Sequence, residues 1–344
     1  MNTRTTLPGA PVVVAPGKLF LCGEYAVLEG APAVMMAVNR QAVGQYIPGW
    51  TAASRVIAES VRRCAEHLGE LAVALPAGSV MVNSEQFQGP DGKLGLGSSA
   101  ATAAATVGAI FEYAGYGIED NRDALYVLAD DAHRAAQGGL GSGADIAAAV
   151  HGGFVRFERP QSLRDTNAAF GPPLFEQLAP PEALEIVVFQ AGLPVATPEM
   201  IEAVQGLARR QKQLYGWMQD ELGLAARQFA EAFTMGRSAG IIEAAGAAHD
   251  TLLALGNAAH VPIVPASVTA ASTHARRMGG AAKISGAGGG DVGVAFFPGK
   301  DAAREFVSTC PSGIKVLDVQ VDMQGIRRRR PAGFPYDESA GKRL

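Results

Sequence analysis

Residues 95–105 read GLGSSAATAAA, and this stretch decides how the rest of the chain is interpreted. Gly95 and Gly97 allow positive φ angles and a close approach of the backbone to a ligand. The alanine-rich segment behind them predicts a helix. A glycine-rich turn at a helix N-terminus is typical of a phosphate site, because the first-turn N–H groups lack helical partners and the helix dipole is positive there. Ser98 and Ser99 add hydroxyls that can cap the helix or hold a metal. The structural alternative is a flexible loop before an ordinary helix.

The N-terminal run 12–28, VVVAPGKLFLCGEYAVL, carries charge at the ends of a short apolar segment. A β-branched strand leads to a break at Pro16-Gly17, and Lys18 follows directly. Glu24 stands at the other end. Charged groups are seldom fully buried without partners. The two side chains are therefore either a solvated pair on an edge strand or a cation and an acid directed into a cleft.

The segment 283–297, KISGAGGGDVGVAFF, predicts a strand, a loop with four glycines and a second strand. Successive backbone N–H groups in such a loop can form an anion-binding nest. The structural alternative is a glycine-rich hairpin. Another glycine-rich turn, QGGLGSGAD at 137–145, precedes a short helix. Asp145 at that helix start is either a cap or a carboxylate held rigidly at the floor of a cleft.

The composition predicts a two-domain globular protein with a large core. The 344 residues are 48% hydrophobic and 18% charged. A net charge of −4 argues against nucleic-acid binding, and the basic run 327–330 is expected to be part of a solvated tail. Three widely separated cysteines fit a reducing cytoplasm without disulfides or a zinc site. No apolar run has the length of a signal-peptide core at the N-terminus or of a membrane span.

Hydrophobic periodicity predicts alternating strands and helices in both halves. Strands are expected at 11–15, 18–23, 33–47, 80–82, 154–157, 184–190, 281–284, 292–297 and 314–321. Helices are expected at 52–68, 99–115, 120–137, 266–279 and 301–309, with two or three more across 198–258. Antiparallel strands with helices on one side indicate an α+β fold. The domain junction is expected within the polar stretch 159–183.

The glycine-rich segments do not fit two common nucleotide-binding motifs. No Gly-Lys-Ser/Thr stands at Walker A spacing, and GLGSSA lacks the dinucleotide fingerprint. The chain instead resembles the GHMP kinase superfamily. Its three motifs appear in order as APGKLFLCGEYAVLEG (15–30), GLGSSAA (95–101) and SGAGGGD (285–291).

Within that superfamily the details resemble the phosphomevalonate kinase family most. The signs are Tyr25 after Glu24, the segment AHRAAQGGLGSGADIAAAVHGG (132–153), and the aspartate that ends SGAGGGD. The resemblance implies ATP-dependent phosphorylation of 5-phosphomevalonate to 5-diphosphomevalonate, a step of the mevalonate pathway in isoprenoid biosynthesis. The alternatives are a mevalonate kinase, another small-molecule kinase of the superfamily, or a non-catalytic ligand sensor on the same fold.

The resemblance also implies a ribosomal-S5-domain-2-like, ATP-binding N-terminal half at 1–175 and a ferredoxin-like C-terminal half at 176–330. Residues 331–344 are expected to form a flexible tail. The active site is expected between the halves. The implied partners are ATP with Mg²⁺ and the small-molecule acceptor, without nucleic acid or membrane. A cytoplasmic monomer or homodimer is expected.

The resemblance assigns the site residue by residue. Lys18 and Asp145 are the expected catalytic pair, and Ser99 is the expected magnesium ligand. The residues expected to bind ATP are Lys93, Gly95, Leu96, Gly97, Ser98, Ser99, Ala100, Gly286, Ala287 and Gly288. Those expected to bind the acceptor are Lys18, Glu24, Tyr25, Lys93, Ser142, Asp145, Thr197, Gly288 and Gly289.

One departure from the family pattern leaves the second metal ligand open. Mevalonate kinases place a magnesium-binding glutamate shortly before the catalytic aspartate. Here that neighbourhood holds Asp131, His133 and Arg134. Asp131 is the nearest carboxylate, and an exposed helix position is the alternative for it. Phosphates and water would then supply most magnesium ligands.

Overall fold

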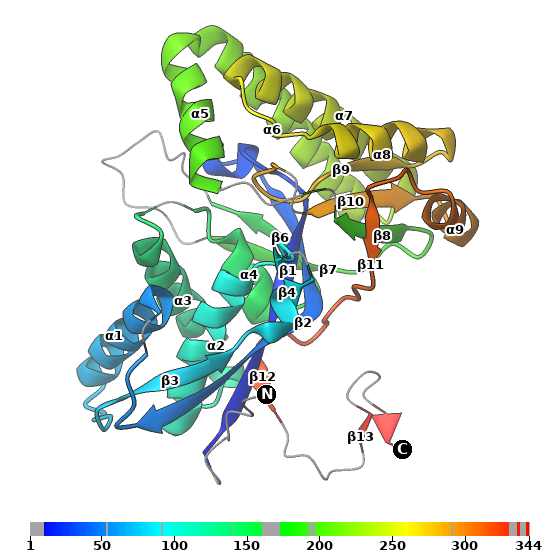
Figure 1. The fold of residues 1–344 in the computed structure, drawn as a ribbon. Coiled ribbons are helices and arrows are strands. Elements are labelled where there is room, and N and C mark those ends of the chain that lie inside the picture. The colour runs from blue at the N-terminus through cyan, green and yellow to red at the C-terminus, as the bar shows by residue number, and fades with distance from the viewer. Residues whose placement is uncertain are drawn as a thin grey trace.

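The computed structural model describes residues 10–159 except 53, 91 and 140, residues 173–190, 192, and 197–329 except 290 and 291. It also describes the short pairs 336–337 and 342–343. The predicted α+β class is confirmed, since two antiparallel sheets each carry their own helices (Figure 1).

The first sheet has six strands in the described part of the chain, in the order β12-β1-β2-β6-β7 with β3 also paired to β2. Their bounds are β1 (Val12–Cys22), β2 (Ala33–Pro48), β3 (Gly78–Asn83), β6 (Phe154–Glu158), β7 (Leu174–Leu178) and β12 (Arg327–Arg328). Helices α1 (Arg55–Glu70), α2 (Ser98–Tyr113), α3 (Arg122–Ala136) and α4 (Ala144–His151) gather on one side of this sheet (Figure 1).

The second sheet has four strands among the described residues, in the order β11-β8-β10-β9. They are β8 (Glu185–Gln190), β9 (Ala281–Ile284), β10 (Val292–Phe297) and β11 (Lys315–Leu317). The helices of this half are α5 (Thr197–Arg210), α6 (Lys212–Thr234), α7 (Ser238–Ala259), α8 (Ala266–Arg277) and α9 (Lys300–Ser308). Short elements complete the chain: η1 (Ala26–Glu29), η2 (Glu85–Phe87), η3 (Glu119–Asn121), the pair β4 (Gln88–Gly89) and β5 (Gly92–Lys93), and the pair β13 (Tyr336–Asp337) and β14 (Lys342–Arg343).

Helix α2 is buried on almost every side, as expected of a helix without a polar face. Two glycines let it lie close to its neighbours. A Cβ on Gly44 of β2 would stand 2.9 Å from the carbonyl oxygen of Ala105. A Cβ on Gly108 would stand 2.5 Å from Cδ1 of Ile326. The helix that begins at the GLGSS turn is therefore fixed against the sheet.

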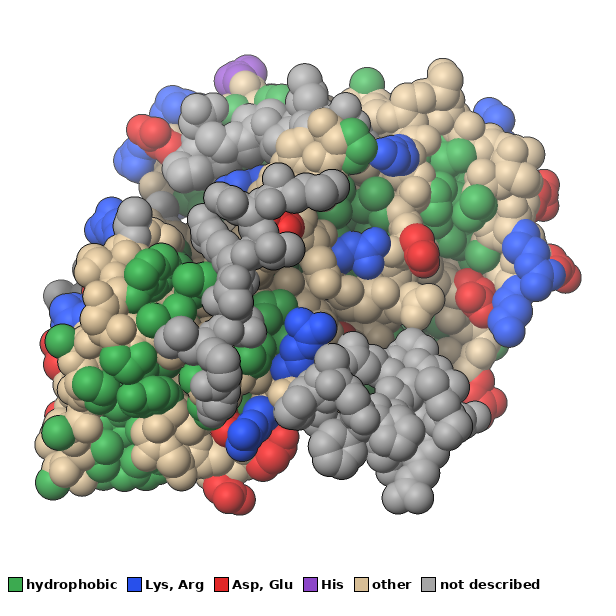
Figure 2. Space-filling model, turned by 60° about the horizontal axis from the view of Figure 1, so that its bottom comes forward, with side chains coloured by type: hydrophobic (Ala, Val, Ile, Leu, Met, Phe, Trp, Pro, Cys, Tyr) green, Lys and Arg blue, Asp and Glu red, His purple; other side chains and the backbone are tan. Residues whose placement is uncertain are grey.

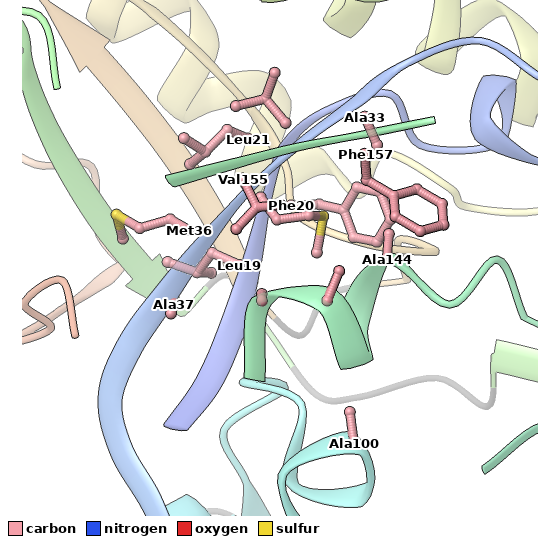
Figure 3. Packing of buried hydrophobic residues seen from close by; sticks show 14 of the residues in the cluster. Leu19, Phe20, Leu21, Ala33, Met36, Ala37, Ala100, Ala144, Val155 and Phe157 are labelled. Carbon is pink, nitrogen blue, oxygen red and sulfur yellow. The ribbon is translucent and has the colours of Figure 1, made fainter. Parts of the chain in front are cut away.

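Strand β1 runs through the core of the first half. Figure 3 shows Leu19 and Phe20 of β1 grouped with Val155 and Phe157 of β6 and with Ala144 of α4. Burial of each large apolar side chain contributes about 1.5–3 kcal/mol. This packing holds the strand that carries Lys18 rigidly beside the start of α4.

Two predictions about strands β1 and β12 of the first sheet are wrong. Pro16-Gly17 does not break the strand, because β1 continues through a β-bulge whose register shifts between these two residues. The basic run 327–330 does not belong to a solvated tail over its described part. Arg327 and Arg328 form β12 against β1, and Arg327 Nη1 lies 3.0 Å from both carboxylate oxygens of Asp322. This ion pair lets a basic segment serve as an edge strand.

The expected domain division stays a prediction. Its boundary at 175/176 falls inside β7, which belongs to the first sheet. Val321 bridges to Val38 of β2, so the chain returns to the first sheet after β11. Most of the expected tail at 331–344 lies outside the described residues.

On the face that Figure 2 shows, the described Lys and Arg side chains lie singly or in small groups among Asp and Glu. Positive and negative side chains are thus mixed on that face. Among the described residues, the helices are either too short or too polar to cross a membrane.

Candidate active site

Strand β1 brings Lys18 onto the GLGSS turn. The Lys18 N–H donates to the carbonyl oxygen of Leu96 at 2.9 Å. A Cβ on Gly97 would stand only 2.7 Å from Cγ of Lys18, so the lysine side chain passes directly over this glycine. Gly95 and Gly97 have φ of 70° and 80°, which confirms the predicted left-handed turn. The first two motifs are therefore in direct contact.

Lys18 meets the predicted carboxylate. Its Nζ lies 3.4 Å from Oδ2 of Asp145, and the two side chains are 10% and 29% exposed. Asp145 is the second residue of α4, whose N-cap is Gly143 with φ 89°. The rest of that helix is almost entirely buried, so the carboxylate is held at a fixed depth. The turn before it is closed by Ser142, whose Oγ accepts a hydrogen bond from the Ala144 N–H at 3.2 Å.

Of the two roles predicted for the hydroxyls of Ser98 and Ser99, helix capping is not found at the start of α2. The N-cap is Gly97, and no side chain caps the helix. Ser98 and Ser99 are the first two helical residues, so their hydroxyls do not serve as caps. Ser99 Oγ instead lies 3.1 Å from Nε2 of His133 on α3. The first-turn N–H groups of α2 have no partner within the helix, which leaves the expected anion site available.

The third motif (285–291) is hydrogen-bonded to the first (15–30). The Phe20 N–H donates to Ser285 Oγ at 2.8 Å, and the Tyr25 hydroxyl donates to the Ala287 carbonyl oxygen at 2.7 Å. Burial raises the pKa of Tyr25, which keeps the phenol protonated for this bond. A Cβ on Gly286 would stand 3.8 Å from Lys18 Nζ. The glycine-rich loop between β9 and β10 is thus a hairpin connection that also reaches the lysine.

A buried ion pair lies beneath this junction. Lys283 Nζ donates to Oε1 of Glu24 and, at 2.7 Å, to the carbonyl oxygen of Ile284. The side chains of Lys283 and Glu24 are 0% and 2% exposed. The Gly286 N–H also points to Oε1 of Glu24 at 3.4 Å. Glu24 is therefore neither solvated on an edge strand nor paired with Lys18.

These segments surround a cavity of about 350 Å³. Its lining combines residues of the glycine-rich segments 137–145 and 285–291 with apolar side chains from η1 and α5, whereas no residue of the GLGSSAA segment (95–101) is part of it. The lining residues are Lys18, Phe20, Glu24, Tyr25, Val27, Leu28, His133, Gln137, Gly141, Ser142, Gly143, Asp145, Ile201, Gly286 and Ala287. The volume suits part of a small molecule.

Several predicted site residues lie outside this lining. Lys93 is exposed on β5, and Leu96 and Ala100 are buried beside the turn. Gly288 and Gly289 have φ of 90° and 84° and lie against Ile263. The side chain of Thr197 falls outside the described residues, as does Asp291, which supports the resemblance and has no predicted role in the site. The assigned roles of these residues stay predictions.

The sequence did not point to three polar residues of the site. Lys283 lies far from Glu24 in sequence, and Gln137 stands out only as the first residue of a glycine-rich turn. His133 stands out only as a neighbour of Asp131. It is 6% exposed, and burial lowers the pKa of its imidazole, a shift that the charge of Asp145 partly opposes. Asp131, the nearest carboxylate, faces Arg63 at 3.7 Å with a half-exposed side chain, so the helix-surface alternative holds for it.

Two family models match the chain. They are GHMP kinases N terminal domain, over residues 59–153, and GHMP kinases C terminal, over residues 229–313. The chain belongs to the GHMP kinase family. These matches and the two antiparallel sheets establish the two-domain GHMP kinase fold, and the protein is a kinase of this family.

This GHMP kinase is similar to enzymes with two different acceptors. It is 27% identical to a phosphomevalonate kinase from a Streptomyces species, with 85% of this chain and 90% of that protein covered. It is 24% identical to a mevalonate kinase from Aeropyrum pernix, with 91% and 96% covered. The solved structure of Streptococcus pneumoniae phosphomevalonate kinase in complex with phosphomevalonate and AMPPNP shares the fold, with a TM-score of 0.77, 18% identity and coverage of 90% and 99%.

Proposed function

We propose that this GHMP kinase transfers the γ-phosphoryl group of ATP to the phosphate of 5-phosphomevalonate, giving 5-diphosphomevalonate and ADP. The observation that carries the proposal is the Lys18–Asp145 pair at 3.4 Å, set between the free N-terminus of α2 and a small cavity. The similarity to the Streptomyces phosphomevalonate kinase across most of both chains supports the choice of acceptor. The retained lysine and aspartate argue against a non-catalytic sensor.

The residues divide the work of phosphoryl transfer between charge neutralisation and alignment. The first-turn amides of α2 would hold the ATP phosphates. Lys18 would neutralise charge on the transferred group as the acceptor phosphate oxygen bonds to γ-phosphorus and the bond to the ADP oxygen breaks. The acceptor oxygen is already ionised near neutral pH, so Asp145 is needed to orient Lys18 and the acceptor more than to remove a proton.

The described residues fit a magnesium ion that arrives with the nucleotide. Ser99 and Asp145 both offer oxygen near His133, and Mg²⁺ is commonly bound by one or two protein oxygens, with phosphates and water completing its shell. No group of three or more acidic, histidine or cysteine side chains suited to a metal occurs in the described part of the chain. The ion would neutralise phosphate charge when bound.

An ADP-release assay across four acceptors tests the proposal. Turnover should be fastest with 5-phosphomevalonate, compared with mevalonate, homoserine and galactose. A preference for mevalonate would instead support the second candidate, which the Aeropyrum relative favours. Asp145→Asn should lower kcat about 100-fold or more while ATP still binds by calorimetry. Unchanged turnover in that variant would remove Asp145 from the mechanism.

A further inference from the structure

We propose that His133 is a positioning residue that directs the hydroxyl oxygen of Ser99 toward the ligand at the N-terminus of α2. This role rests on the proposed function in one respect, which is that a nucleotide binds with its metal at that end of the helix. It does not depend on which small molecule accepts the phosphoryl group. Its basis is the small polar cluster of Ser99 on α2, His133 on α3 and Gln137 at the end of α3, of which His133 and Gln137 line the cavity.

The cluster has an unusual arrangement of donors and acceptors. Nε2 of His133 lies 3.1 Å from Ser99 Oγ and 2.9 Å from Nε2 of Gln137. An amide nitrogen can only donate a hydrogen bond, and a ring nitrogen that carries a proton cannot accept one. Nε2 of His133 is therefore the unprotonated acceptor of the ring, and the ring proton is on Nδ1.

This assignment fixes the direction of the serine hydroxyl. Ser99 has one hydroxyl proton, and the only atom of His133 near it is an acceptor. The hydroxyl therefore donates to His133, and its lone pairs point away from the imidazole. An oxygen oriented in this way can coordinate a cation but has no proton left to donate to a phosphate. Ser99 thus acts as a metal ligand and does not donate a hydrogen bond to a phosphate.

The same geometry separates His133 from two other roles. It does not act as a general base toward the phosphoryl acceptor, because the single lone pair of Nε2 is already shared by the hydrogen bonds from Ser99 and Gln137. It is also unlike a histidine that only fills the core. Its imidazole contacts the polar side chains of Ser99 and Gln137, and it lines the cavity with Gln137. Gln137, which is exposed, fixes the imidazole by occupying the same nitrogen.

The test compares His133→Leu, which removes the acceptor, with His133→Gln, whose amide oxygen can still accept from Ser99. The affinity of a non-hydrolysable ATP analogue is measured by calorimetry with and without Mg²⁺, and ADP release is measured alongside. Loss of one hydrogen bond predicts an about tenfold smaller Mg²⁺-dependent gain in affinity for His133→Leu. His133→Gln should recover most of this gain.

A double-mutant cycle with Ser99→Ala decides whether His133 acts through the serine. In the Ser99→Ala background, His133→Leu should cause no further loss. An equal loss in both backgrounds, or a loss that is the same without Mg²⁺, would overturn the proposal. His249→Leu, a substitution of another buried histidine on α7, is the matched control and should leave the Mg²⁺-dependent gain unchanged.

A variant at an exposed position guards against a folding defect in His133→Leu. Gln137→Leu should reduce the Mg²⁺-dependent gain about threefold, because the imidazole is then free to place its proton on either nitrogen. No effect of Gln137→Leu together with no rescue by His133→Gln would count against the cluster. If the wild type binds the analogue with Mg²⁺ but does not phosphorylate 5-phosphomevalonate, only the proposed acceptor fails.

Discussion

The buried ion pair between Glu24 and Lys283 allows a quantitative stability prediction. Lys283 is fully buried, and Oε2 of Glu24 is buried without a hydrogen-bond partner. Removing one partner leaves the other charge uncompensated in an apolar interior. Lys283→Met should therefore lower the free energy of unfolding by about 3–5 kcal/mol.

This loss corresponds to a measurable change in the melting temperature. Unfolding entropy is about 2.1 cal/mol/K per residue, which for 344 residues gives roughly 0.7 kcal/mol per degree. The Tm of Lys283→Met should thus fall by about 4–7 °C in calorimetry. Glu24→Leu should show a drop of the same order, because the buried Lys283 ammonium would lose its counter-ion and keep its hydrogen bond to the Ile284 carbonyl oxygen.

The double variant Glu24→Leu/Lys283→Met makes the reasoning refutable. Replacing both charges with apolar side chains of similar size removes the uncompensated charge, so its stability should return to within about 1 kcal/mol of the wild type. Arg62→Met is the control, since its pair with Glu66 lies on the surface, where water screens the two charges, and its loss should leave the Tm nearly unchanged. A double variant that loses the sum of the two single losses would show that the charges are not coupled.

Three further predictions concern the turn, a buried histidine and the cysteines. Gly97→Ala should lower kcat at least about tenfold, because its Cβ would displace Lys18 and its φ of 80° is strained for alanine. Gly49→Ala is the control, since Gly49 has a φ of 75° but open space around it. Measured by kinetics and by melting, it should lower stability and leave kcat unchanged. Burial lowers the pKa of His249 to about 4, so the stability this neutral histidine contributes is complete above its unfolded pKa of 6.5 and is lost as pH falls from 6.5 to 4. This loss amounts to about 3 kcal/mol, and urea unfolding across that pH range should show a shallower acid limb for His249→Leu. Cys310, which is partly exposed, should react first with a thiol reagent in the native protein, and Cys310→Ser should abolish the fast phase, whereas a fast phase that survives this substitution would contradict the burial of the other two cysteines.

Local sequence patterns were sufficient to predict many of the helices and strands. The alanine-rich run after GLGSS forms α2, and the apolar run from Val292 forms β10. In both cases the residues of the segment itself indicate the type of element and its burial. The same patterns misplaced Pro16-Gly17 and the arginines of β12. A register shift and an edge strand depend on partner strands elsewhere in the chain, here β2 for Pro16-Gly17 and β1 for the arginines.

The candidate site shows the same limit more sharply. The motifs named Lys18 and Asp145, and the structure brings them together at 3.4 Å. They could not identify Lys283 as the partner of Glu24, because a contact between β9 and the turn after β1 leaves no trace in the spacing of either segment. His133 carries no motif of its own. Its role follows only from the hydrogen bond to Ser99, which requires α2 and α3 to be packed together.

The placement of Lys18 explains why three separate motifs are needed for one side chain. The second motif holds its backbone through the Leu96 carbonyl and gives its side chain passage over Gly97. The third motif brings Gly286 near its Nζ, and α4 supplies Asp145. A flexible lysine would lose on the order of 2 kcal/mol of side-chain entropy each time it was ordered for transfer. Because the three segments already order it in the folded protein, that cost is met in folding and does not recur in the reaction.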